Sequence, residues 1–295
     1  MALFGILNVD KPAGCSSRDV VNRVERLVRP AKAGHAGTLD PLASGVLAIC
    51  VGQATRLVQY VQRMPKQYRA TFLLGQVSET DDLEGQVTLL ADAPEPTRAA
   101  IKNLLPRFMG RIEQRPPAYS AIKLAGRRAY ELARQGRAVE PAARTVVIHG
   151  LHLERYEYPE LELSIECGSG TYIRALGRDL AAALGTSAVM SALRRTAIGG
   201  FCVEDAVPLE ELTAESLPHN LQSPLAAVAD LPRVTLSDEQ LEEIRHGRPI
   251  AFLSGGAGSP ADATSEWAAI DAAGQLAAIL REKRPGELWP EKMLV

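Results

Sequence analysis

One carboxylate in this chain stands where a catalytic acid could be held rigidly. Asp40 lies within residues 34–47, a segment rich in Gly and Pro that leads directly into the apolar run 46–51. Pro41 restricts the residue before it to extended conformations, and glycines permit sharp turns or the close approach of another chain. An aspartate fixed in this way can act as a nucleophile or as a general base. Many Asp-Pro pairs, however, only cap a turn.

Two further side chains are compatible with chemistry on an RNA base. Arg174 follows a Gly-rich segment at the predicted start of a helix, and a neighbouring arginine favours and orients an ionised carboxylate. Tyr68 supplies an aromatic ring that can stack on a base drawn out of its helix. The residues by themselves do not show that Asp40, Arg174 and Tyr68 meet in space.

The formal net charge of −2 conceals a segregation of charge along the chain. Residues 109–145 carry eight Arg or Lys against three acids, whereas residues 201–245 carry ten acids against two Arg. A basic segment beside acidic surface indicates a face for a polyanion. Basic helices are commonly only solvated, and the near-neutral total argues against a protein that coats nucleic acid indiscriminately.

Several common classes of protein lack their usual signals here. The 295 residues have ordinary globular composition, enough for one large or two ordinary domains. The chain has no Gly-x-x-x-x-Gly-Lys phosphate loop, no Gly-x-Ser-x-Gly elbow and no His-Glu-x-x-His zinc helix. No apolar run approaches the length of a membrane span, and the four cysteines form no Cys-x-x-Cys pair. We therefore expect a cytoplasmic protein without metal or membrane association.

The elements that must position these side chains follow from the hydrophobic pattern. We predict strands over residues 4–9, 46–51, 66–74, 145–156 and 161–167, and helices over 17–28, 54–61, 97–108, 173–184 and 237–246. Residues 86–90 are expected to pair with the strand at 66–74, across an acidic turn at 79–85 that we expect to be a solvated loop. A short helix is expected around Tyr130 and Ala133, and the prolines after about residue 205 are typical of a linker.

Residues 34–47 resemble the signature Gly-His-x-Gly-x-Leu-Asp-Pro-x-Ala-x-Gly-x-Leu of the TruB family of tRNA pseudouridine synthases. Other resemblances follow in the family's order from residue 7 to about residue 198. They comprise the opening motif at 8–17, the tyrosine motif at 66–70, the insertion motifs at 117–123 and 129–136, and the segments 167–174 and 193–196. Ala36 departs from the pattern, because the family frequently has Thr there.

The resemblance implies an α/β (α+β) pseudouridine synthase fold, with a mixed, mostly antiparallel sheet flanked by helices. Residues 1–230 would form the catalytic domain, with an RNA-binding insertion at about 111–144, and residues 231–295 a small β-rich PUA-like domain. The implied activity is that of an isomerase, which converts the uridine at position 55 in the TΨC loop of tRNA to pseudouridine. The base would flip out, lose its glycosidic bond and be re-attached through C5, with no cofactor or metal.

The resemblance also assigns roles to individual residues of the site. Asp40 matches the catalytic aspartate and Arg174 its partner. Tyr68 matches the ring that stacks on the flipped uracil, and it is a candidate for handling the proton at C5. Leu193 matches an apolar residue of the pocket, and His35 matches the residue that enters the RNA loop and helps to hold the base out. Whether Asp40 attacks C6 of uracil or C1′ of ribose, or whether a glycal forms, stays open.

Further contacts to the substrate are expected around this group. Tyr172 is placed with the substrate-binding residues, and Lys11, although its role is mainly structural, is placed with the RNA-binding residues. The other predicted RNA contacts are Lys123, Arg127, Arg128 and Arg134. The expected partner is the TΨC stem-loop of tRNA, bound by a monomer that needs no other protein.

Two alternatives of function remain open from the sequence. The chain could act chiefly as an RNA-binding tRNA folding chaperone with secondary catalysis. It could instead resemble the guide-RNA-dependent relatives, which need protein partners. The continuous insertion at residues 111–144 favours a stand-alone enzyme.

Overall fold

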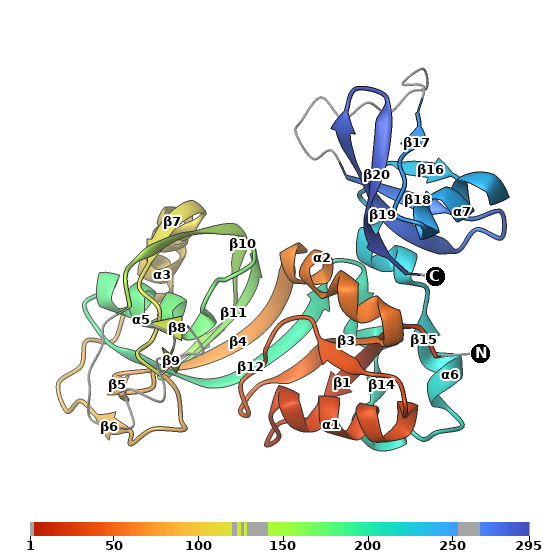
Figure 1. The fold of residues 1–295 in the computed structure, drawn as a ribbon. Helices are drawn as coiled ribbons and strands as arrows, with labels where there is room; N and C mark the ends of the chain where they lie inside the picture. The colour runs from red at the N-terminus through yellow and green to blue at the C-terminus, as the bar shows by residue number, and fades with distance from the viewer. Residues whose placement is uncertain (1–2, 120–122, 125–126, 129–140, 253–265, 295) are drawn as a thin grey trace.

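The computed structural model describes residues 3–119, 123–124, 127–128, 141–252 and 266–294 (Figure 1). The short helix expected around Tyr130 and Ala133 lies outside the described residues. Among the residues that are described, no helix combines the length and the apolar character needed to cross a membrane.

A mixed sheet forms the frame of the larger part of the molecule, and eleven described strands belong to it. These strands are β1 (Gly5–Lys11), β2 (Ala33–His35), β3 (Ser44–Val51), β4 (Lys66–Leu74), β7 (Gly110–Gln114), β10 (Arg144–Glu157), β11 (Glu160–Cys167), β12 (Ala188–Ile198), β13 (Phe201–Cys202), β14 (Val207–Pro208) and β15 (Leu221–Gln222). The main path runs β14-β1-β3-β12-β4-β11-β10-β7, and only the β1–β14 and β3–β12 pairs of this described sheet are parallel. The predicted mixed, mostly antiparallel sheet is therefore confirmed.

The pairing predicted for residues 86–90 is wrong. β6 (Thr88–Leu89) pairs with β5 (Gln76–Val77), whereas β4 lies between β11 and β12. Both edges of β4 are occupied by β11 and β12, which are longer than β6 and pack buried side chains together with those of β4. Leu89 of β6 is 71% exposed and buries little apolar surface. The basic segment contributes a second small ladder, β8 (Lys123–Leu124) with β9 (Arg127–Arg128).

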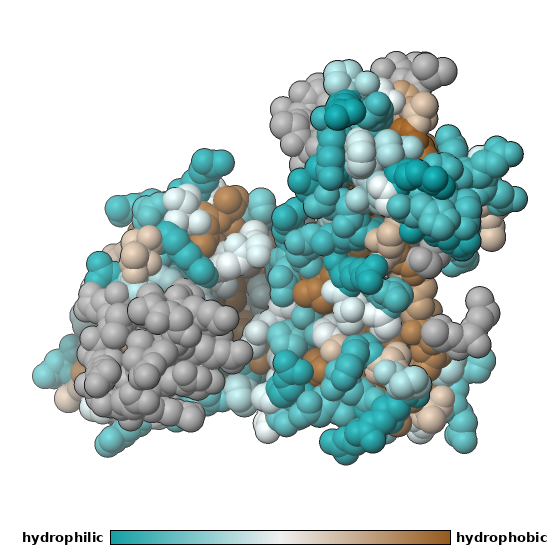
Figure 2. Space-filling model, in the orientation of Figure 1, coloured by the Kyte–Doolittle hydropathy of each residue, from teal (hydrophilic) through white to brown (hydrophobic). Residues whose placement is uncertain are grey.

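Short helices lie on the faces and at the ends of the mixed sheet, except α7, which packs against the C-terminal strands. They are α1 (Ser17–Val28), α2 (Val58–Arg63), α3 (Arg98–Leu104), α5 (Ile173–Ala183), α6 (Leu217–Asn220) and α7 (Asp238–Arg245), with the 3-10 helices η1 (Gly52–Leu57), η2 (Leu105–Phe108), η3 (Val203–Asp205), η4 (Leu209–Glu211) and η5 (Pro224–Val228). α1 begins at a capping box formed by Ser16 and Asp19 and buries a valine face against β1 and β3. Hydrophilic residues cover much of the surface over α1 and α7 (Figure 2).

Residues 205–230 are not a linker. β14 and β15 both pair with β1, and Leu212 and Leu217 join the core between α1 and the sheet. The prolines divide this segment into short pieces, but each piece buries apolar side chains on the larger domain.

The C-terminal residues build a separate five-stranded sheet, as the predicted small β-rich domain requires. Its order is β16 (Arg233–Thr235), β18 (Glu266–Ile270), β19 (Leu276–Arg284), β20 (Glu287–Met293) and β17 (Ile250–Ala251). Ile279 and Leu294 also pack with Leu57 and Val61 of η1 and α2 in one buried cluster. The two sheets therefore share a core where they meet.

The pairing of β3 with β12 is short. These strands pair only through Ser44 and Gly45 opposite Arg194 and Arg195. Gly45 has a φ of +99°, and a Cβ there would lie 2.2 Å from the carbonyl oxygen of Arg195. Only glycine permits both this conformation and this approach.

We predict that Gly45→Ala destabilises the protein far more than Gly14→Ala does. Gly14 has a φ of +87° with nothing within 4 Å of an added Cβ, so it carries only the conformational cost, about 1–2 kcal/mol. Gly45→Ala adds a backbone clash and should lower the free energy of unfolding by more than about 4 kcal/mol. Urea denaturation of the two variants measures the difference. Equal losses would show that β3 and β12 separate easily.

Candidate active site

The turn that carries Asp40 connects β2 to β3 and is fastened to the start of α1. The Ser17 hydroxyl accepts a hydrogen bond from the Leu39 amide at 2.8 Å and donates one to the Leu39 carbonyl at 3.0 Å. The Gly14 amide donates to the Pro41 carbonyl at 2.8 Å. Both neighbours of Asp40 are thus fixed, while its side chain is 36% exposed. A substrate can reach this carboxylate without moving the turn.

A buried arginine supports the same turn from β12. Arg195 is 1% exposed, and its Nε donates to the Val46 carbonyl at 2.7 Å. Its terminal nitrogens donate to the carbonyls of Gly37 at 3.1 Å and Thr38 at 3.5 Å. A guanidinium has five donors and no acceptor, so it suits a site lined by carbonyl oxygens. Arg195 therefore joins the backbone before Asp40 to the backbone after it.

Arg174 lies between two carboxylates. One terminal nitrogen is 3.0 Å from Asp40 Oδ2, and the other is 3.0 Å from Asp82 Oδ2 and donates to the Thr80 carbonyl at 2.8 Å. Arg174 is 7% exposed and Asp82 is fully buried. The predicted pairing of Asp40 with Arg174 is present, and Asp82 holds the guanidinium from the buried side.

The acidic turn at residues 79–85 is therefore not the solvated loop that we expected. The Thr80 hydroxyl donates to Asp82 Oδ1 at 2.5 Å, and the Glu84 amide donates to the same oxygen at 3.0 Å. Glu84 in turn accepts a hydrogen bond from the Leu42 amide at 3.2 Å, so the acidic turn reaches back to the Asp40 turn. The Thr80 and Glu84 donors satisfy Asp82 Oδ1, whereas Oδ2 has no hydrogen-bond partner among the described residues and is compensated by the charge of Arg174.

Tyr68 and Leu193 join the same site from neighbouring strands. Tyr68 on β4 pairs in register with Arg195, and both Tyr68 and Leu193 pack in a cluster that contains Leu39 from the Asp40 turn. Burial raises the pKa of the Tyr68 hydroxyl, although the charge of Arg195 opposes this. The hydroxyl is thus kept protonated, and the ring forms part of an apolar wall beside the carboxylate.

His35 ends β2 close to this group. Burial lowers its pKa, and the positive charges of Arg18 and Arg195 lower it further. Its Nδ1 is buried, with no hydrogen-bond partner among the described residues. The neutral imidazole is therefore the favoured form.

Tyr172 lies next to the site without sharing its contacts. It is the N-cap of α5, and the Gln114 side chain binds its backbone in both directions, at 2.7 and 3.0 Å. The guanidinium of Arg144 lies over its ring, 4.8 Å from the centroid. No described contact of this ring involves Asp40.

Two protein-family models together match residues 25–234 of the chain. The model for the TruB family pseudouridylate synthase N-terminal domain matches residues 25–173, and that for the tRNA pseudouridylate synthase B C-terminal domain matches residues 174–234. The chain belongs to the TruB family of pseudouridylate synthases. The resemblance found in its motifs is thereby confirmed.

Known members of the TruB family and one solved structure extend this match. The tRNA pseudouridine synthase B of Arthrobacter sp. (strain FB24) is 44% identical over 288 residues, 95% of this chain and 93% of the relative. That of Rhodospirillum rubrum is 41% identical over 300 residues, 99% and 97% of the two chains. A chain in the crystal structure of a Cbf5-Nop10-Gar1 complex is 26% identical, with a TM-score of 0.75, covering all of this chain and 86% of that one. The predicted pseudouridine synthase fold is confirmed.

Lys11, one of the predicted RNA contacts, is enclosed by the turn that precedes α1. It is fully buried, and its ammonium donates to the carbonyls of Pro12 at 2.8 Å and Cys15 at 2.6 Å. Burial lowers its pKa. These contacts place Lys11 inside the turn that precedes α1, and its contact with RNA stays a prediction.

The other predicted RNA contacts are only partly described. Lys123, Arg127 and Arg128 belong to the β8–β9 ladder, of which the backbone alone is described. Arg134 lies outside the described residues. Their contact with RNA stays a prediction.

Two residues of the TruB-family site escaped the sequence analysis in different ways. Nothing in residues 79–85 distinguishes Asp82 from its acidic neighbours, because its burial depends on Arg174 far along the chain. Arg195 had a usable signal, since it shares one side of an alternating strand with Leu193, and a charge at an inward position has to be satisfied.

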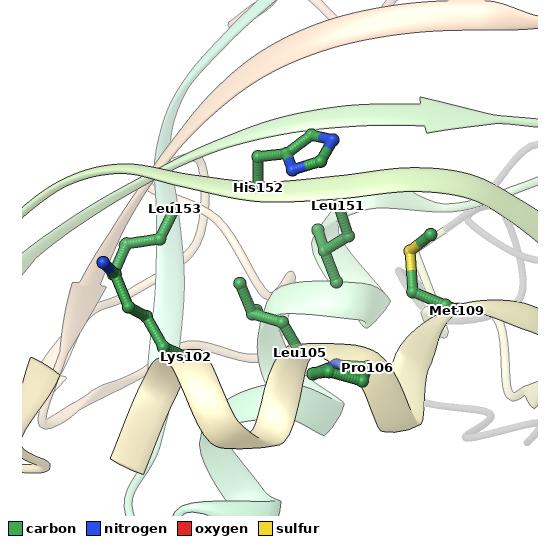
Figure 3. Close-up of a pocket in the computed structure, with 7 residues that line it drawn as sticks. All are labelled: Lys102, Leu105, Pro106, Met109, Leu151, His152 and Leu153. Carbon is green, nitrogen blue, oxygen red and sulfur yellow. The ribbon is translucent and has the colours of Figure 1, made fainter. Parts of the chain in front are cut away.

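A pocket elsewhere in the TruB fold does not belong to this site. It lies between β10 and the α3–η2 helices (Figure 3), and it has a volume of about 510 Å³. The pocket is lined by Lys102, Leu105, Pro106, Met109, Leu151, His152 and Leu153. This lining contains no carboxylate and none of the predicted site residues. In the described part of the chain, no three His, Cys, Asp or Glu side chains gather as a metal site would require.

We predict that Asp82→Asn lowers the free energy of unfolding by about 3–5 kcal/mol, because it removes the charge that pairs with buried Arg174. The matched control is Glu162→Gln, which breaks a pair with Arg69 whose side chains are 26% and 63% exposed. That change should cost less than about 1 kcal/mol. Urea denaturation compares the two variants. A loss for Asp82→Asn no larger than that of the control would mean that Arg174 does not depend on Asp82.

Proposed function

We propose that this protein converts the uridine at position 55, in the TΨC loop of tRNA, to pseudouridine. The names of the relatives that are 41–44% identical over nearly the whole chain support tRNA as the substrate. The observation that carries the chemistry is a half-exposed carboxylate, Asp40, which is paired with Arg174 and set on a fixed turn beside the apolar wall of Tyr68 and Leu193. An uncharged base can lie on such a wall while its sugar faces the acid.

The reaction rearranges bonds within one nucleotide. The bond between N1 and C1′ breaks, the uracil turns, a bond forms between C5 and C1′, and the proton of C5 is lost as N1 gains one. In our proposal Asp40 starts the cleavage as a nucleophile or base, and Arg174 orients its carboxylate. No atom is oxidised and no group leaves the nucleotide, so the reaction itself calls for no cofactor.

Three neighbours of Asp40 receive supporting roles. Tyr68 stacks on the everted uracil, and in our proposal its hydroxyl is the candidate for handling the proton at C5. Leu193 packs on the uracil, and neutral His35 enters the RNA loop in place of the flipped nucleotide. Burial of a neutral imidazole among RNA bases costs less than burial of a charged one.

We further propose that the protein acts without protein partners. The solved neighbour is found in a complex with Nop10 and Gar1, yet it is only 26% identical to this chain. The identity to the relative named tRNA pseudouridine synthase B is much greater, at 44%, and that name mentions no partner protein. In our proposal the basic segment binds RNA phosphates.

We predict that Asp40→Asn abolishes the reaction, with a loss of at least about a thousandfold, or about 4 kcal/mol of transition-state stabilisation. The assay uses the purified protein, an unmodified tRNA transcript and mapping of the pseudouridine. Asp205→Asn, a change at an exposed acid on η3, is the control and should keep wild-type activity. Wild-type activity in Asp40→Asn, or a product at another position, would overturn the proposal.

We predict a graded response at Tyr68. If stacking is its main role, Tyr68→Phe keeps the ring and loses less activity than Tyr68→Leu, by the ~1–3 kcal/mol that a base–aromatic stack contributes. Rates at saturating tRNA measure this difference. Equal losses of activity in the two variants would show that the hydroxyl, and not stacking of the ring, is the main contribution of Tyr68.

A further inference from the structure

A second arginine on α5 repeats the arrangement of Arg174 one helical turn later. Arg178 Nη1 is 2.8 Å from Asp81 Oδ2, beside the pair in which Arg174 Nη1 is 3.0 Å from Asp82 Oδ2. Residues four apart lie on the same face of a helix. Two successive acids of one turn are thus held by two successive turns of α5.

The same two arginines also hold the chain that leads into the basic insertion. Arg178 Nη2 donates to the Arg115 carbonyl at 2.8 Å, and Arg174 Nη2 donates to the Tyr119 carbonyl at 3.2 Å. Arg178 Nε completes its contacts with Asp179 Oδ1 at 2.9 Å. Burial lowers the pKa of Arg178, but the hydrogen bond to Asp179 and the charge of Asp81 raise it above its ordinary value.

The residue that Arg178 holds is under backbone strain. Asp81 has a φ of +60°, and it is the one non-glycine residue with positive φ among those described. Such a conformation is unfavourable for a residue with a side chain and persists only where the surroundings impose it. Here the Asp81 carbonyl accepts from the Met190 amide of β12 at 2.9 Å, while Arg178 holds the side chain.

The helix that carries both arginines cannot shift easily. At Gly177, between them, an added Cβ would lie 2.0 Å from a ring carbon of Phe72, which is 1% exposed on β4. α5 therefore lies directly against the sheet, and the backbone that carries the Arg174 and Arg178 side chains is held in place.

We propose that Arg178 is a positioning residue for the reaction. Through Asp81 it fixes the strained acidic turn, so that Asp82 holds Arg174 and Arg174 presents Asp40. Through the Arg115 carbonyl it ties the base of the RNA-binding insertion to the same helix. This inference rests on the proposed function, because it assigns Arg178 to the same reaction at Asp40.

The test separates these two connections by their kinetic effects. Asp81→Asn keeps a residue that tolerates positive φ and removes only the charge that Arg178 pairs with in the acidic turn, so kcat should fall about tenfold while KM for tRNA stays within about twofold. Arg178→Gln removes both links, so kcat should fall at least as far and KM should rise several-fold. The double variant should lose no more kcat than Arg178→Gln, since both changes act through one pair.

A matched control removes an arginine ion pair far from this helix. Arg155→Gln breaks exposed pairs with Glu157 and Glu160 at the end of the β10–β11 hairpin and should leave kcat and KM unchanged. Thermal unfolding of each variant identifies loss of fold, and the rates are compared well below the midpoints. A role in stability alone would lower these midpoints without changing the rate of the folded enzyme.

The outcomes distinguish this inference from the function on which it rests. If wild-type protein forms no pseudouridine in tRNA, the proposed function fails. If wild type is active but Asp81→Asn and Arg178→Gln both behave like Arg155→Gln, the positioning role alone is wrong. Additive losses of kcat in the double variant would equally show that Arg178 does not act through Asp81.

Discussion

The site depends on one guanidinium that is shared between an exposed and a buried carboxylate. Arg174 is 7% exposed, so its charge has to be satisfied by partners in the protein. Asp82, which is fully buried, pairs with one terminal nitrogen of this guanidinium, and Asp40 pairs with the other. Because a guanidinium is planar and its donors are fixed, placing one edge places the other. The exposed acid is thus oriented from inside the protein rather than by solvent.

The rest of the fold brings distant segments to this point and satisfies them there. The Asp40 turn comes from the first sixth of the chain, the acidic turn from the loop between β5 and β6, and the two arginines from α5 and β12. The buried cations near the turn, Lys11 and Arg195, donate to backbone carbonyls, which carry no charge that could compete for Arg174. The parallel contact of β3 with β12 at Gly45 closes the frame, because it sets Arg195 directly under the turn.

Local patterns predicted the elements of this fold well. The capped start of α1, the strand over 66–74 and the paired strands that became β10 and β11 follow from signals contained within each segment. The pairing of residues 86–90 was wrong because a strand's partner is decided by competition. β11 and β12 bury more apolar surface on β4 than the exposed Leu89 segment can. The segment after residue 205 was misread for a related reason, since its prolines are visible in the sequence but the β1 edge that receives it is not.

Within the site, the sequence predicted the residues that lie in strong motifs, and it could not predict the residues defined by contact. Asp40 and Arg174 were found together only because a family resemblance joined them; nothing in the 133 intervening positions of sequence requires their pairing at 3.0 Å. Asp82 is chemically indistinguishable from Asp81 along the chain, yet one is fully buried beneath Arg174 and the other is strained and held by Arg178. A run of acids in a turn is ordinarily solvated, and it becomes a scaffold only when a helix supplies cations at the spacing of its turns. Arg174 and Arg178 have that spacing, so a pair of arginines four residues apart was the available signal that the acidic turn had a buried partner.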